Sequence, residues 1–560
     1  MNLPERIAAA RALPGRPHAE RTTSHTSLGA LLAERARTDG DRSFLTFLGE
    51  GDRIELTYAE FARRVEGFAD YLATLHDIRP GDRIVTLSVN HHQTVTAYFA
   101  AWWLGAVIVP VNCAEEDDRV AYMIENCGAK LIVAHGAQMD RAFELSRRCP
   151  NVAAVVPVSY AGNRPGGAHA SGARPPVDPA LDLEALIVYT SGTTGPPKGV
   201  VLTQYNLLAD AGAIAGWHGF GADSRIMCVL PIHHVNGTVV TLVTPVVAGS
   251  SLVLSRKFSV SHFFESIGAE NVQVVSVVPT LLKYLLEHHG KVPYARDAVP
   301  TLRYLICGAG PLTVELAAQF EERFGVRILH GYGLSETTCY SCFLPVDLLP
   351  AEHRRWMSEF GFPSIGAALP VNELAILDDQ DRPQPPGERG EICARGHNVM
   401  VEYFARPDAN ESAFRAGWFH TGDEGFWQPG PGGTPYFFIT GRLKELIVRG
   451  GVKVAPLELD EVLSAIPGVR RAMAVGFEST WYGEEVGAYV EPDPAHHPAI
   501  TSDAVVEHCR KILPFHKQPK VVILGADFPV TSTGKYQRNR LRPLFAAWKE
   551  VQFRDPAKAC

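Results

Sequence analysis

Short apolar runs alternate with helix-length segments through most of this 560-residue chain. Runs made largely of Val, Ile and Leu fit strands that are buried on both faces, and their alternation with helices favours parallel α/β layers. At this length we expect more than one domain. The runs are RIVTLSV (83–89), LIVAHG (131–136), LIVYT (186–190), RIMCVL (225–230), SLVLS (251–255), VQVVSVVP (272–279), LRYLICG (302–308) and RILHG (327–331).

The composition narrows the class of protein. A formal net charge of −8 argues against a general affinity for nucleic acids or acidic membranes. No apolar run reaches about 18 residues, so we expect no spanning helix and no stable membrane insertion. Residues 1–21 lack the hydrophobic region of a signal peptide. Their Arg and Ala content is similar to that of a transit peptide, but we expect an untargeted cytoplasmic protein.

The ten cysteines are scattered without the spacing of a disulfide or zinc framework. Cys339 and Cys342 form a single C-x-x-C pair, whereas zinc would need a second pair or nearby histidines. A redox role for this pair stays open. Because thiols are reduced in the cytoplasm, we expect free cysteines.

A change of pattern near residue 441 divides the chain. Before it, GERGEICARG (387–396) and TPYFFIT (434–440) predict a small β-rich region, and the Pro/Gly/Ala-rich residues 159–180 predict a surface connection. After it, the apolar segments predict a compact α+β unit of about 100 residues. The predicted fold is α/β: a large multi-layer N-terminal domain with parallel sheets and a small β-rich subdomain (1–440), a hinge (441–444), a small α+β C-terminal domain (445–548) and a frayed tail (549–560).

The string YTSGTTGPPKGV (189–200) follows one of the buried runs and has the chemistry of a phosphate-binding loop. Glycines let successive N–H groups turn toward one point, and hydroxyls and a lysine add donors and charge. The string differs from the P-loop pattern, because Lys198 lies between a proline and a glycine. Prolines lack N–H groups, so the cradle has to be built from residues 191–195. A polar surface loop is the alternative, but so ordered a string after a buried strand favours a phosphate site.

Four further motifs place polar residues beside glycines or aromatic rings. Read singly, each has an ordinary structural explanation: Tyr332 as a core aromatic, Asp423 in a tight turn, Arg442 as a solvated charge and Lys535 as a loop lysine. The motifs are HGYGLSE (330–336), WFHTGD (418–423), GRLKE (441–445) and TSTGK (531–535).

In this order the motifs resemble those of the acyl-adenylate-forming superfamily. That superfamily contains acyl- and aryl-CoA synthetases, the adenylation domains of peptide synthetases, and firefly-type luciferases. The resemblance extends from about Ser27 to Leu544, and it implies a large N-terminal domain with a small mobile lid. Further matching stretches are LPIHHVNG (230–237), CGAGPL (307–312), GERGEICARG (387–396) and GVKVAPLELDEVL (451–463).

The resemblance implies a site in which a carboxylate attacks the α-phosphate of ATP. Two anions have to meet in that step, so positive charge must offset their repulsion. Lys535 is implied to bridge the carboxylate and the phosphate. Glu336 is implied to bind Mg²⁺, since a hard cation prefers carboxylate and phosphate oxygens. The catalytic residues implied in this way are Lys535, Glu336, His234 and Lys444.

The same resemblance implies how the nucleotide is held. Tyr332 would stack on adenine, Asp423 would accept hydrogen bonds from the ribose hydroxyls, and Arg442 would reach the ribose or a phosphate. Ser335 stands where the family more often has threonine, and it keeps the hydroxyl. The implied ATP- and AMP-binding residues are Thr190, Ser191, Gly192, Thr193, Thr194, Gly195, Lys198, Gly308, Ala309, Gly310, Gly331, Tyr332, Gly333, Ser335, Asp423, Arg442 and Lys535.

A mixed anhydride with AMP hydrolyses if it is released, so the resemblance also implies a second half-reaction in the same site. The small domain would rotate about a hinge at Lys444 and withdraw Lys535. Arg449, Gly450 and Gly451 would then face the channel for the thiol of CoA, where glycines let a pantetheine arm approach the backbone. A plain hairpin turn is the alternative for the two glycines, and both interpretations can hold.

The acid pocket is implied by the segment LPIHHVNGT (230–238), which holds no acidic residue to pair with an amine. An α-amino acid is therefore disfavoured. CGAGPL and GYGLSE resemble the segments of fatty-acyl- and hydroxycinnamoyl-CoA ligases more than those of acetate-type synthetases, which implies a medium-chain or aryl acid. The same resemblance implies that His234 lies between the acid pocket and the thiol channel. The implied pocket residues are His234, Asn236, Gly237, Cys307 and Thr337, with Gly308, Ala309 and Gly331 beside them.

Three activities remain open from the sequence. The first is an AMP-forming acid–CoA ligase that uses ATP, Mg²⁺ and coenzyme A. The second is an acyl-AMP ligase that loads an acyl carrier protein, because its phosphopantetheine offers the same thiol. The third is a luciferase-like oxidoreductase. A non-catalytic nucleotide-binding protein is disfavoured, because Lys535, Glu336 and Asp423 are all present.

Overall fold

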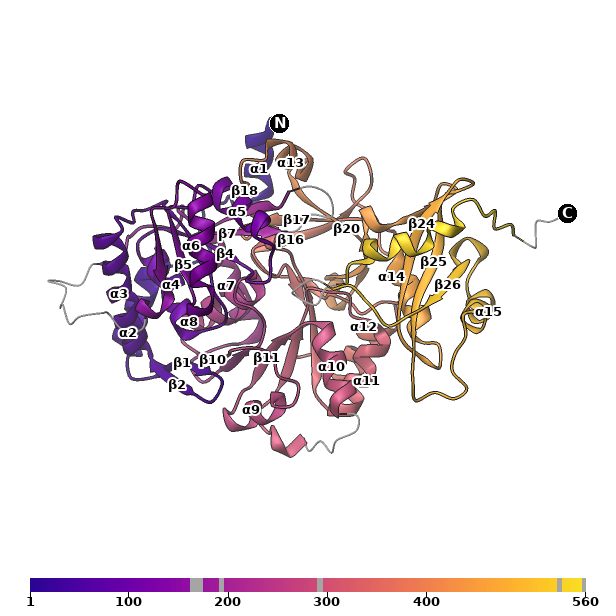
Figure 1. Ribbon diagram of the computed structural model, residues 1–560, viewed down its shortest axis with the longest axis horizontal. Helices are drawn as coiled ribbons and strands as arrows, with labels where there is room; N and C mark the ends of the chain where they lie inside the picture. The colour runs from indigo at the N-terminus through magenta and orange to yellow at the C-terminus, as the bar shows by residue number, and fades with distance from the viewer. Residues whose placement is uncertain (162–174, 191–195, 290–295, 531–535, 556–560) are drawn as a thin grey trace.

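The computed structural model describes residues 1–161, 175–190, 196–289, 296–530 and 536–555. The chain forms two large sheets, a smaller antiparallel sheet and a C-terminal sheet (Figure 1). The predicted mixed α/β fold with parallel sheets is confirmed. None of the helices in these ranges has the length and apolar character that crossing a membrane requires.

The first sheet has the strand order β18-β8-β7-β4-β3-β5-β6. Its centre is parallel, and β4 is buried along its whole length, as expected of a strand covered on both faces. β7 and β8 form an antiparallel pair, so the glycine loop joins two neighbouring strands. The bounds are β3 (Arg83–Leu87), β4 (Val107–Val111), β5 (Leu131–Ala134), β6 (Ala154–Pro157), β7 (Glu184–Thr190), β8 (Lys198–Thr203) and β18 (Glu402–Tyr403).

The second sheet has the order β15-β14-β13-β12-β11-β9-β10-β1-β2. The pairs from β1 and β10 through to β12 and β13 are parallel. The carboxyl ends of β12 and β13 therefore meet at one edge of the sheet, which is where ligands bind in open α/β sheets. The bounds are β1 (Ser43–Leu48), β2 (Arg53–Thr57), β9 (Arg225–Cys228), β10 (Ser251–Ser255), β11 (Val274–Val277), β12 (Tyr304–Cys307), β13 (Arg327–Tyr332), β14 (Cys342–Phe343) and β15 (Ala367–Ala368).

Helices cover these two sheets (Figure 1). α7, predicted after the glycine loop, begins behind a capping box, in which Thr203 and Asn206 bond each other's backbone N–H groups. The bounds are α1 (Leu3–Ala10), α2 (Leu28–Thr38), α3 (Tyr58–Leu75), α4 (His92–Trp103), α5 (Asp117–Asn126), α6 (Met139–Arg148), α7 (Gln204–His218), the π-helix η3 (Asn236–Val243), α8 (Thr244–Ala248), α9 (Phe263–Ala269), α10 (Pro279–His289), α11 (Val314–Phe324), α12 (Pro350–Ser358) and α13 (Pro407–Ala413).

The small β-rich region is an antiparallel sheet, in which β16, β17, β20 and β19 lie side by side and β21 pairs with β20. Its aromatic side chains pack tightly, as where the rings of Phe426 and Phe438 stack at 4.7 Å between centroids. The bounds are β16 (Asn372–Leu377), β17 (Gly390–Gly396), β19 (Phe414–Arg415), β20 (Trp418–Pro429) and β21 (Pro435–Arg442).

The C-terminal sheet, β23-β22-β25-β24 with β26 paired to β25, is covered by α14 and α15. Within residues 549–555 of the predicted tail, two carbonyls accept hydrogen bonds from the C-terminal part: that of Glu550 from the indole of Trp481, and that of Phe553 from the guanidinium of Arg449. The bounds are β22 (Ile447–Arg449), β23 (Val452–Val454), α14 (Pro456–Ser464), β24 (Val469–Ser479), β25 (Gly483–Pro492), α15 (Ser502–Ile512) and β26 (Val521–Leu524).

Three polar contacts join this C-terminal part to α10 and α11. The ammonium of Lys283 donates to the carbonyl of Arg470 at 2.7 Å, and the guanidinium of Arg470 lies 2.9 Å from Glu287. Val314 N, at the start of α11, donates to both carboxylate oxygens of Glu461 at 3.1 Å. Water can also satisfy the groups that make these three contacts.

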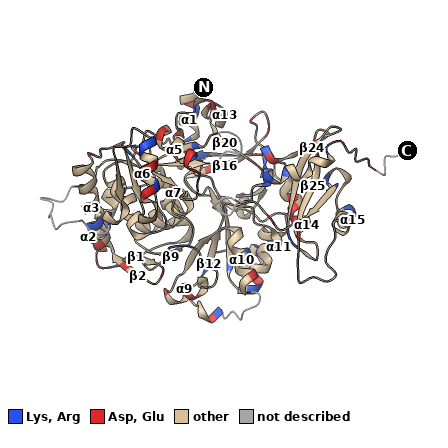
Figure 2. Ribbon diagram, in the orientation of Figure 1, with Lys and Arg blue, Asp and Glu red and all other residues tan. Residues whose placement is uncertain are grey.

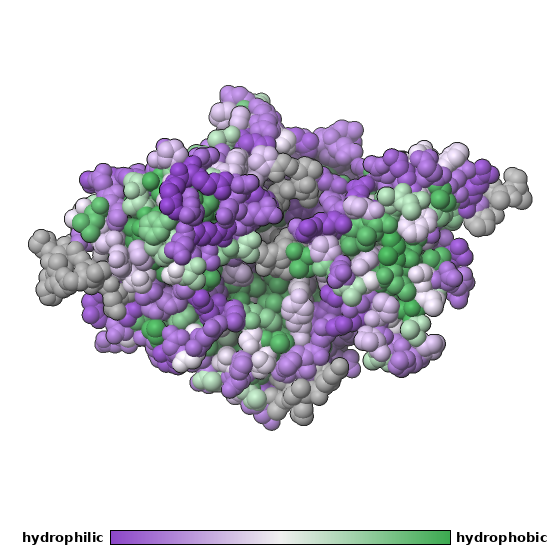
Figure 3. Space-filling view, viewed as in Figure 1, coloured by the Kyte–Doolittle hydropathy of each residue, from purple (hydrophilic) through white to green (hydrophobic). Residues whose placement is uncertain are grey.

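The visible surface is mixed in character. Basic and acidic residues are interspersed over both parts of the molecule in Figure 2. Figure 3 shows hydrophobic residues gathered over β25 and β26, and exposed apolar side chains in the C-terminal part include Trp481 and Leu524. Apolar atoms contribute much of the surface of any folded protein, so we attach no function to this region.

Candidate active site

A cavity of about 720 Å³ lies between the second sheet and the C-terminal part of the chain. The end of β13 contributes Tyr332, and the β20–β21 pair contributes Asp423 and Arg442. Tyr536 and Arg538 line it from the C-terminal side. The cavity therefore brings together residues of the motifs HGYGLSE, WFHTGD and GRLKE. Tyr536 directly follows the fourth motif, TSTGK.

Asp423 is the centre of the polar wall of this cavity. Its side chain is fully buried, Tyr332 Oη donates to Oδ2 at 2.6 Å, and Arg442 Nε lies 2.7 Å from Oδ1. Asp423 directly faces Arg442 across the two strands, so strand register fixes the ion pair. It lies within β20 rather than in the tight turn that the sequence suggested.

The same contacts shift the pKa values of the partners. The Asp423 carboxylate raises the pKa of Arg442. The pKa of the Tyr332 phenol is raised well above its usual value, mainly by burial and to a lesser extent by the charge of Asp423. Arg442 therefore remains a cation and Tyr332 a neutral donor. Asp423 is among the residues that line the cavity, and a carboxylate can accept more than two hydrogen bonds.

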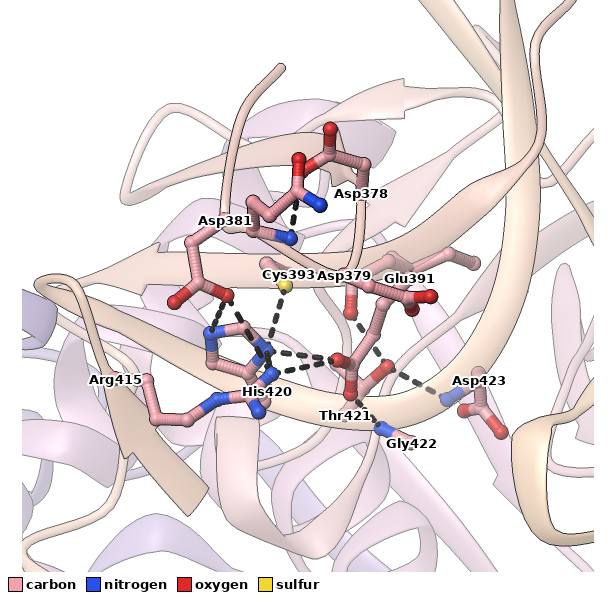
Figure 4. A network of polar contacts seen from close by, with 12 residues as sticks. Asp378, Asp379, Asp381, Glu391, Cys393, Arg415, His420, Thr421, Gly422 and Asp423 are labelled. Atoms are coloured by element: carbon pink, nitrogen blue, oxygen red, sulfur yellow. Dashed lines mark hydrogen bonds and ion pairs between the residues drawn. The ribbon is translucent and has the colours of Figure 1, made fainter. Parts of the chain in front are cut away.

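Behind Asp423 lies a second polar network, which the sequence analysis missed (Figure 4). Gly422 has a φ of +74°, a conformation that glycine adopts without strain, and its N–H donates to Glu391 Oε1 at 2.8 Å. The other oxygen of Glu391 lies 2.7 Å from His420 Nδ1. Asp423 N donates to Thr421 Oγ1 at 3.1 Å. The backbone on the N-terminal side of Asp423 is therefore held by side chains.

Glu391, Cys393 and His420 place metal-ligand atoms within 4.8 Å of one another in this network. However, Arg415 Nη2 lies 2.8 Å from His420 Nδ1 and 3.3 Å from Glu391 Oε2. A guanidinium already supplies the positive charge at that point. We therefore assign the group a structural part rather than a metal site.

Glu336 lies in the short 3₁₀ helix η5 (Ser335–Thr337), after β13. Tyr403 Oη donates to its Oε1 at 2.8 Å, and the ammonium of Lys198 lies 4.1 Å from the centre of the Tyr403 ring. Burial lowers the pKa of Lys198, Glu336 opposes that shift, and Lys444 adds to it. Glu336 and Lys444 are thus each within electrostatic reach of Lys198. The carboxylate oxygens of Glu336 suit a hard cation.

The predicted acid-pocket residues lie around the ends of β11 and β12. Asn236 begins η3, and its Nδ2 donates to Tyr340 Oη at 3.0 Å. Ser276 Oγ donates to Asn236 Oδ1 at 2.7 Å. Tyr340 and Ser276 were not predicted, because neither lies in a motif. Cys307, Gly308 and Thr337 are buried nearby, whereas His234 is half-buried beside His233.

Other predicted residues have the following places. Ala309, with a φ of +64°, lines the cavity together with Gly310, Gly331 and Gly333. Ser335 lies in η5. Thr190 ends β7, and its hydroxyl donates to the carbonyl of Lys198 at 3.4 Å. Ser191, Gly192, Thr193, Thr194, Gly195 and Lys535 lie outside the described residues.

Arg449, Gly450 and Gly451 are not among the residues that line the cavity. They form the tip of the β22–β23 hairpin, where both glycines have positive φ, so the hairpin-turn interpretation is confirmed. Arg449 pairs with the buried Glu485 at 2.5 Å. Cys339 and Cys342 are free and buried, which gives them no accessible redox role.

Comparison with known proteins identifies the family. The family described as "AMP-binding enzyme" matches residues 32–404, and "AMP-binding enzyme C-terminal domain" matches residues 458–535. The chain belongs to the AMP-binding enzyme family. A sulfoacetate–CoA ligase of Cupriavidus necator is 32% identical over 522 residues, covering 92% of this chain and 97% of the relative. An oxalate–CoA ligase of Arabidopsis thaliana is 30% identical over 520 residues, covering 91% and 97%.

A solved structure supports the same assignment. ATP-bound MatB from Rhodopseudomonas palustris superimposes with a TM-score of 0.81 at 26% identity, covering 93% of this chain and 99% of that one. This member of the AMP-binding enzyme family is accordingly an ATP-dependent acid–CoA ligase that activates a carboxylic acid as its acyl-AMP and transfers the acyl group to CoA. The predicted resemblance, enzyme class and cofactors are confirmed.

Proposed function

We propose that the cavity between β13, β20 and the C-terminal part is where this ligase forms its acyl-AMP. The observation that supports this most strongly is the convergence of Tyr332, Asp423 and Arg442, which come from three strands, on one wall. Asp423, paired with Arg442, would accept hydrogen bonds from the ribose hydroxyls. The Tyr332 ring, held by its hydrogen bond to Asp423, would lie against the adenine.

The phosphates would lie toward Lys198, Lys444 and Glu336. Lys198 carries positive charge to the side of the site where pyrophosphate leaves, and Glu336 would bind Mg²⁺ through its carboxylate. When bound, Mg²⁺ offsets phosphate charge. We keep the bridging role for Lys535 and the pyrophosphate-binding role for residues 191–195 as proposals from the sequence. The position of Tyr536 at the cavity supports the first of these.

The second half-reaction needs a different arrangement of the C-terminal part. Here Tyr536 lines the cavity while the Arg449–Gly451 hairpin tip does not, which is the arrangement expected for adenylation. We infer that residues 445–548 rotate about a hinge at 441–444, relative to residues 1–440, and bring the hairpin toward the thiol. The contacts of Lys283, Glu287 and Val314 with that part would break in the rotation.

The decisive experiment is adenylation across a panel of carboxylic acids with ATP and Mg²⁺, trapped as hydroxamates with hydroxylamine. The best acid is then incubated with CoA, and the thioester is detected by its mass. We expect pyrophosphate release that depends on the acid, followed by a thioester of CoA. Pyrophosphate release without any acid would indicate a nucleotide hydrolase and contradict the proposal. An acylated carrier protein, with no CoA thioester, would favour the carrier as acceptor.

A further inference from the structure

The first sheet changes the direction of its connections between β3 and β5, which pair side by side. β3 leads through α4 to β4, whereas β5 leads through α6 to β6 on the other side. α4 packs with α3 and α6 packs with α5, in two separate hydrophobic cores. In open α/β sheets, ligands bind outside the carboxyl ends of the strands at such a switch point. The cavity of the proposed acyl-AMP site has no lining residue from this sheet.

Two histidines and an arginine meet at this switch point. His91 follows β3, His135 directly follows β5, and their ring centroids lie 5.8 Å apart. Arg256 directly follows β10 of the second sheet, and its Nη1 lies 3.5 Å from His135 Nε2. The three side chains therefore come from the carboxyl ends of strands in both large sheets.

Backbone hydrogen bonds decide which nitrogen of each imidazole carries the proton. His91 Nδ1 accepts from Gln93 N at 3.3 Å, and His135 Nδ1 accepts from Ala137 N at 3.4 Å. Because a neutral imidazole has one donor and one acceptor nitrogen, Nε2 of each ring carries the hydrogen. His135 and Arg256 therefore face each other donor to donor. In the part of the chain that the structure describes, neither Nε2 has a hydrogen-bond acceptor.

The charge around these donors is positive and lacks a close counter-ion. Among the described residues, no carboxylate lies within 4.0 Å of the Arg256 guanidinium. Burial, His135 and Arg256 lower the pKa of His91 to about 4, and the exposed Asp52 opposes them with a smaller effect. Burial and Arg256 also lower the pKa of His135. Two neutral imidazole donors thus lie beside a permanent cation, and an anion would complete their hydrogen bonds.

A phosphate group has the chemistry that this cluster needs. Its oxygens point in several directions, so donors from three strands can each reach one, whereas the two oxygens of a carboxylate lie in one plane. Hydrogen bonds from arginine and imidazole to phosphate are charge-assisted and are stronger than those between neutral groups. Phosphate is also the anion that the reaction brings, in ATP and in CoA.

The cluster is tied to the segment that the resemblance places beside the thiol channel. Asn90, between β3 and α4, donates to the carbonyl of Leu230 at 2.9 Å and accepts from Ile232 N at 2.9 Å. It also donates to the carbonyl of Ser255, at the end of β10, at 3.1 Å. CoA as well as free phosphate is therefore a source of the anion.

We propose that His91, His135 and Arg256 form a binding site for a phosphate group at the switch point of the first sheet, separate from the nucleotide site. The phosphate is either free or carried by CoA, whose end remote from the thiol would then be anchored there. The CoA source rests on the proposed function, whereas the binding of phosphate itself does not.

The first test is calorimetric titration of the full-length protein with inorganic phosphate, without nucleotide. We expect saturable binding that weakens about tenfold or more in Arg256→Gln, as when a hydrogen bond to a charged group is lost. His135→Asn keeps a side-chain acceptor for Ala137 N and removes Nε2, so it should weaken binding as well. Lys257→Ala is the matched control, because this neighbouring cation is exposed and pairs with Glu50 at 2.8 Å. It should bind phosphate as the wild type does.

The second test identifies the source through KM in thioester formation. If CoA carries the phosphate, Arg256→Gln should raise KM for CoA by about tenfold, and Lys257→Ala should leave it unchanged. A preference for CoA over 3′-dephospho-CoA that disappears in Arg256→Gln would assign the 3′-phosphate. If phosphate binds in the first test and KM for CoA is unaffected by Arg256→Gln, the site takes free phosphate.

The outcomes that overturn the inference are distinct from those that bear on the proposed function. Absence of phosphate binding in the wild type together with an unchanged KM for CoA in Arg256→Gln overturns it. Equal weakening in Lys257→Ala and Arg256→Gln does so too, because it would show a general effect of charge. If Arg256→Gln does not fold, Arg256→Lys and His135→Asn decide instead. Failure to form any thioester would defeat the proposed function and leave the calorimetric result standing.

Discussion

The hydroxyl of Tyr332 donates a hydrogen bond of 2.6 Å to Asp423, a residue 91 positions away in the sequence and fully buried. This bond joins the end of β13 in the second sheet to β20 in the antiparallel sheet. It fixes the aromatic ring relative to the carboxylate at the cavity wall. The two residues therefore act as one unit, and a change in either alters the other.

Replacing Tyr332 with Phe keeps the ring and removes this hydrogen bond. Because hydrogen bonds to charged groups contribute about 1.5–3 kcal/mol, we expect kcat/KM for ATP to fall by roughly tenfold or more while KM for the acid changes little. Steady-state kinetics and calorimetric titration with AMP measure both effects. Tyr304→Phe, which loses a buried hydroxyl remote from the cavity, is the control. Unaltered AMP affinity in Tyr332→Phe would contradict the proposed nucleoside site.

The two half-reactions can be separated at Lys535. We expect Lys535→Ala to abolish adenylate formation, since the repulsion between the carboxylate and the phosphate is no longer offset. Thioester formation from a supplied acyl-AMP should be largely spared, because the proposed rotation withdraws this lysine. Hydroxamate trapping follows the first step and mass spectrometry the second. If Lys535→Ala lost activity equally in both half-reactions, the proposal that the C-terminal part changes its arrangement between them would be ruled out.

Glu391 is expected to act on ATP through the backbone of Gly422, without touching the nucleotide. Glu391→Ala removes the acceptor of the Gly422 N–H, so KM for ATP should rise several-fold while kcat changes less. Glu391→Gln keeps an acceptor oxygen and should restore part of the affinity. Glu373→Ala, which breaks the 2.9 Å pair with Arg395 on the neighbouring strands, is the matched control. If Glu391→Ala and Glu373→Ala have the same KM for ATP, Glu391 does not help to position the backbone that contacts ATP.

The contact between Glu461 and α11 predicts a pH dependence. Burial raises the pKa of Glu461 from 4.5 to about 8, although the Val314 N–H opposes the shift. Between these two values the folded protein holds a proton that the unfolded chain has lost, so this contribution to stability falls as pH rises and is lost above about pH 8.

Thermal unfolding of the wild type and Glu461→Gln across that pH range tests this expectation. At the acidic end of the range, Glu461→Gln should have the same Tm as the wild type, because Gln mimics the protonated acid. Above pH 8, Glu461→Gln should have the higher Tm. Glu458→Gln, on the same helix but paired with Lys517 and Arg389, is the control. Parallel Tm curves for wild type and Glu461→Gln would refute the assignment.

The strands of the two large sheets were predictable because each is a continuous apolar run, as in LIVYT before the glycine loop. Tyr332, Asp423 and Arg442 were predictable as candidates because their motifs resemble a family. Tyr340 and Ser276 were not, since a buried polar residue has no local pattern and its partners lie far away in the sequence. Glu391 and His420 escaped for the same reason: only the pairing of β17 with β20 brings them together.

The contacts of Lys283, Glu287 and Val314 with the C-terminal part have a kinetic consequence. On the proposed cycle each is broken and remade at every turnover, so their strength enters the rate of domain rotation. Partly exposed ion pairs such as Arg470–Glu287 are weak and are screened by salt. If the C-terminal part rotates as proposed, we expect the ionic strength of the surroundings to change how fast the enzyme passes from one half-reaction to the next.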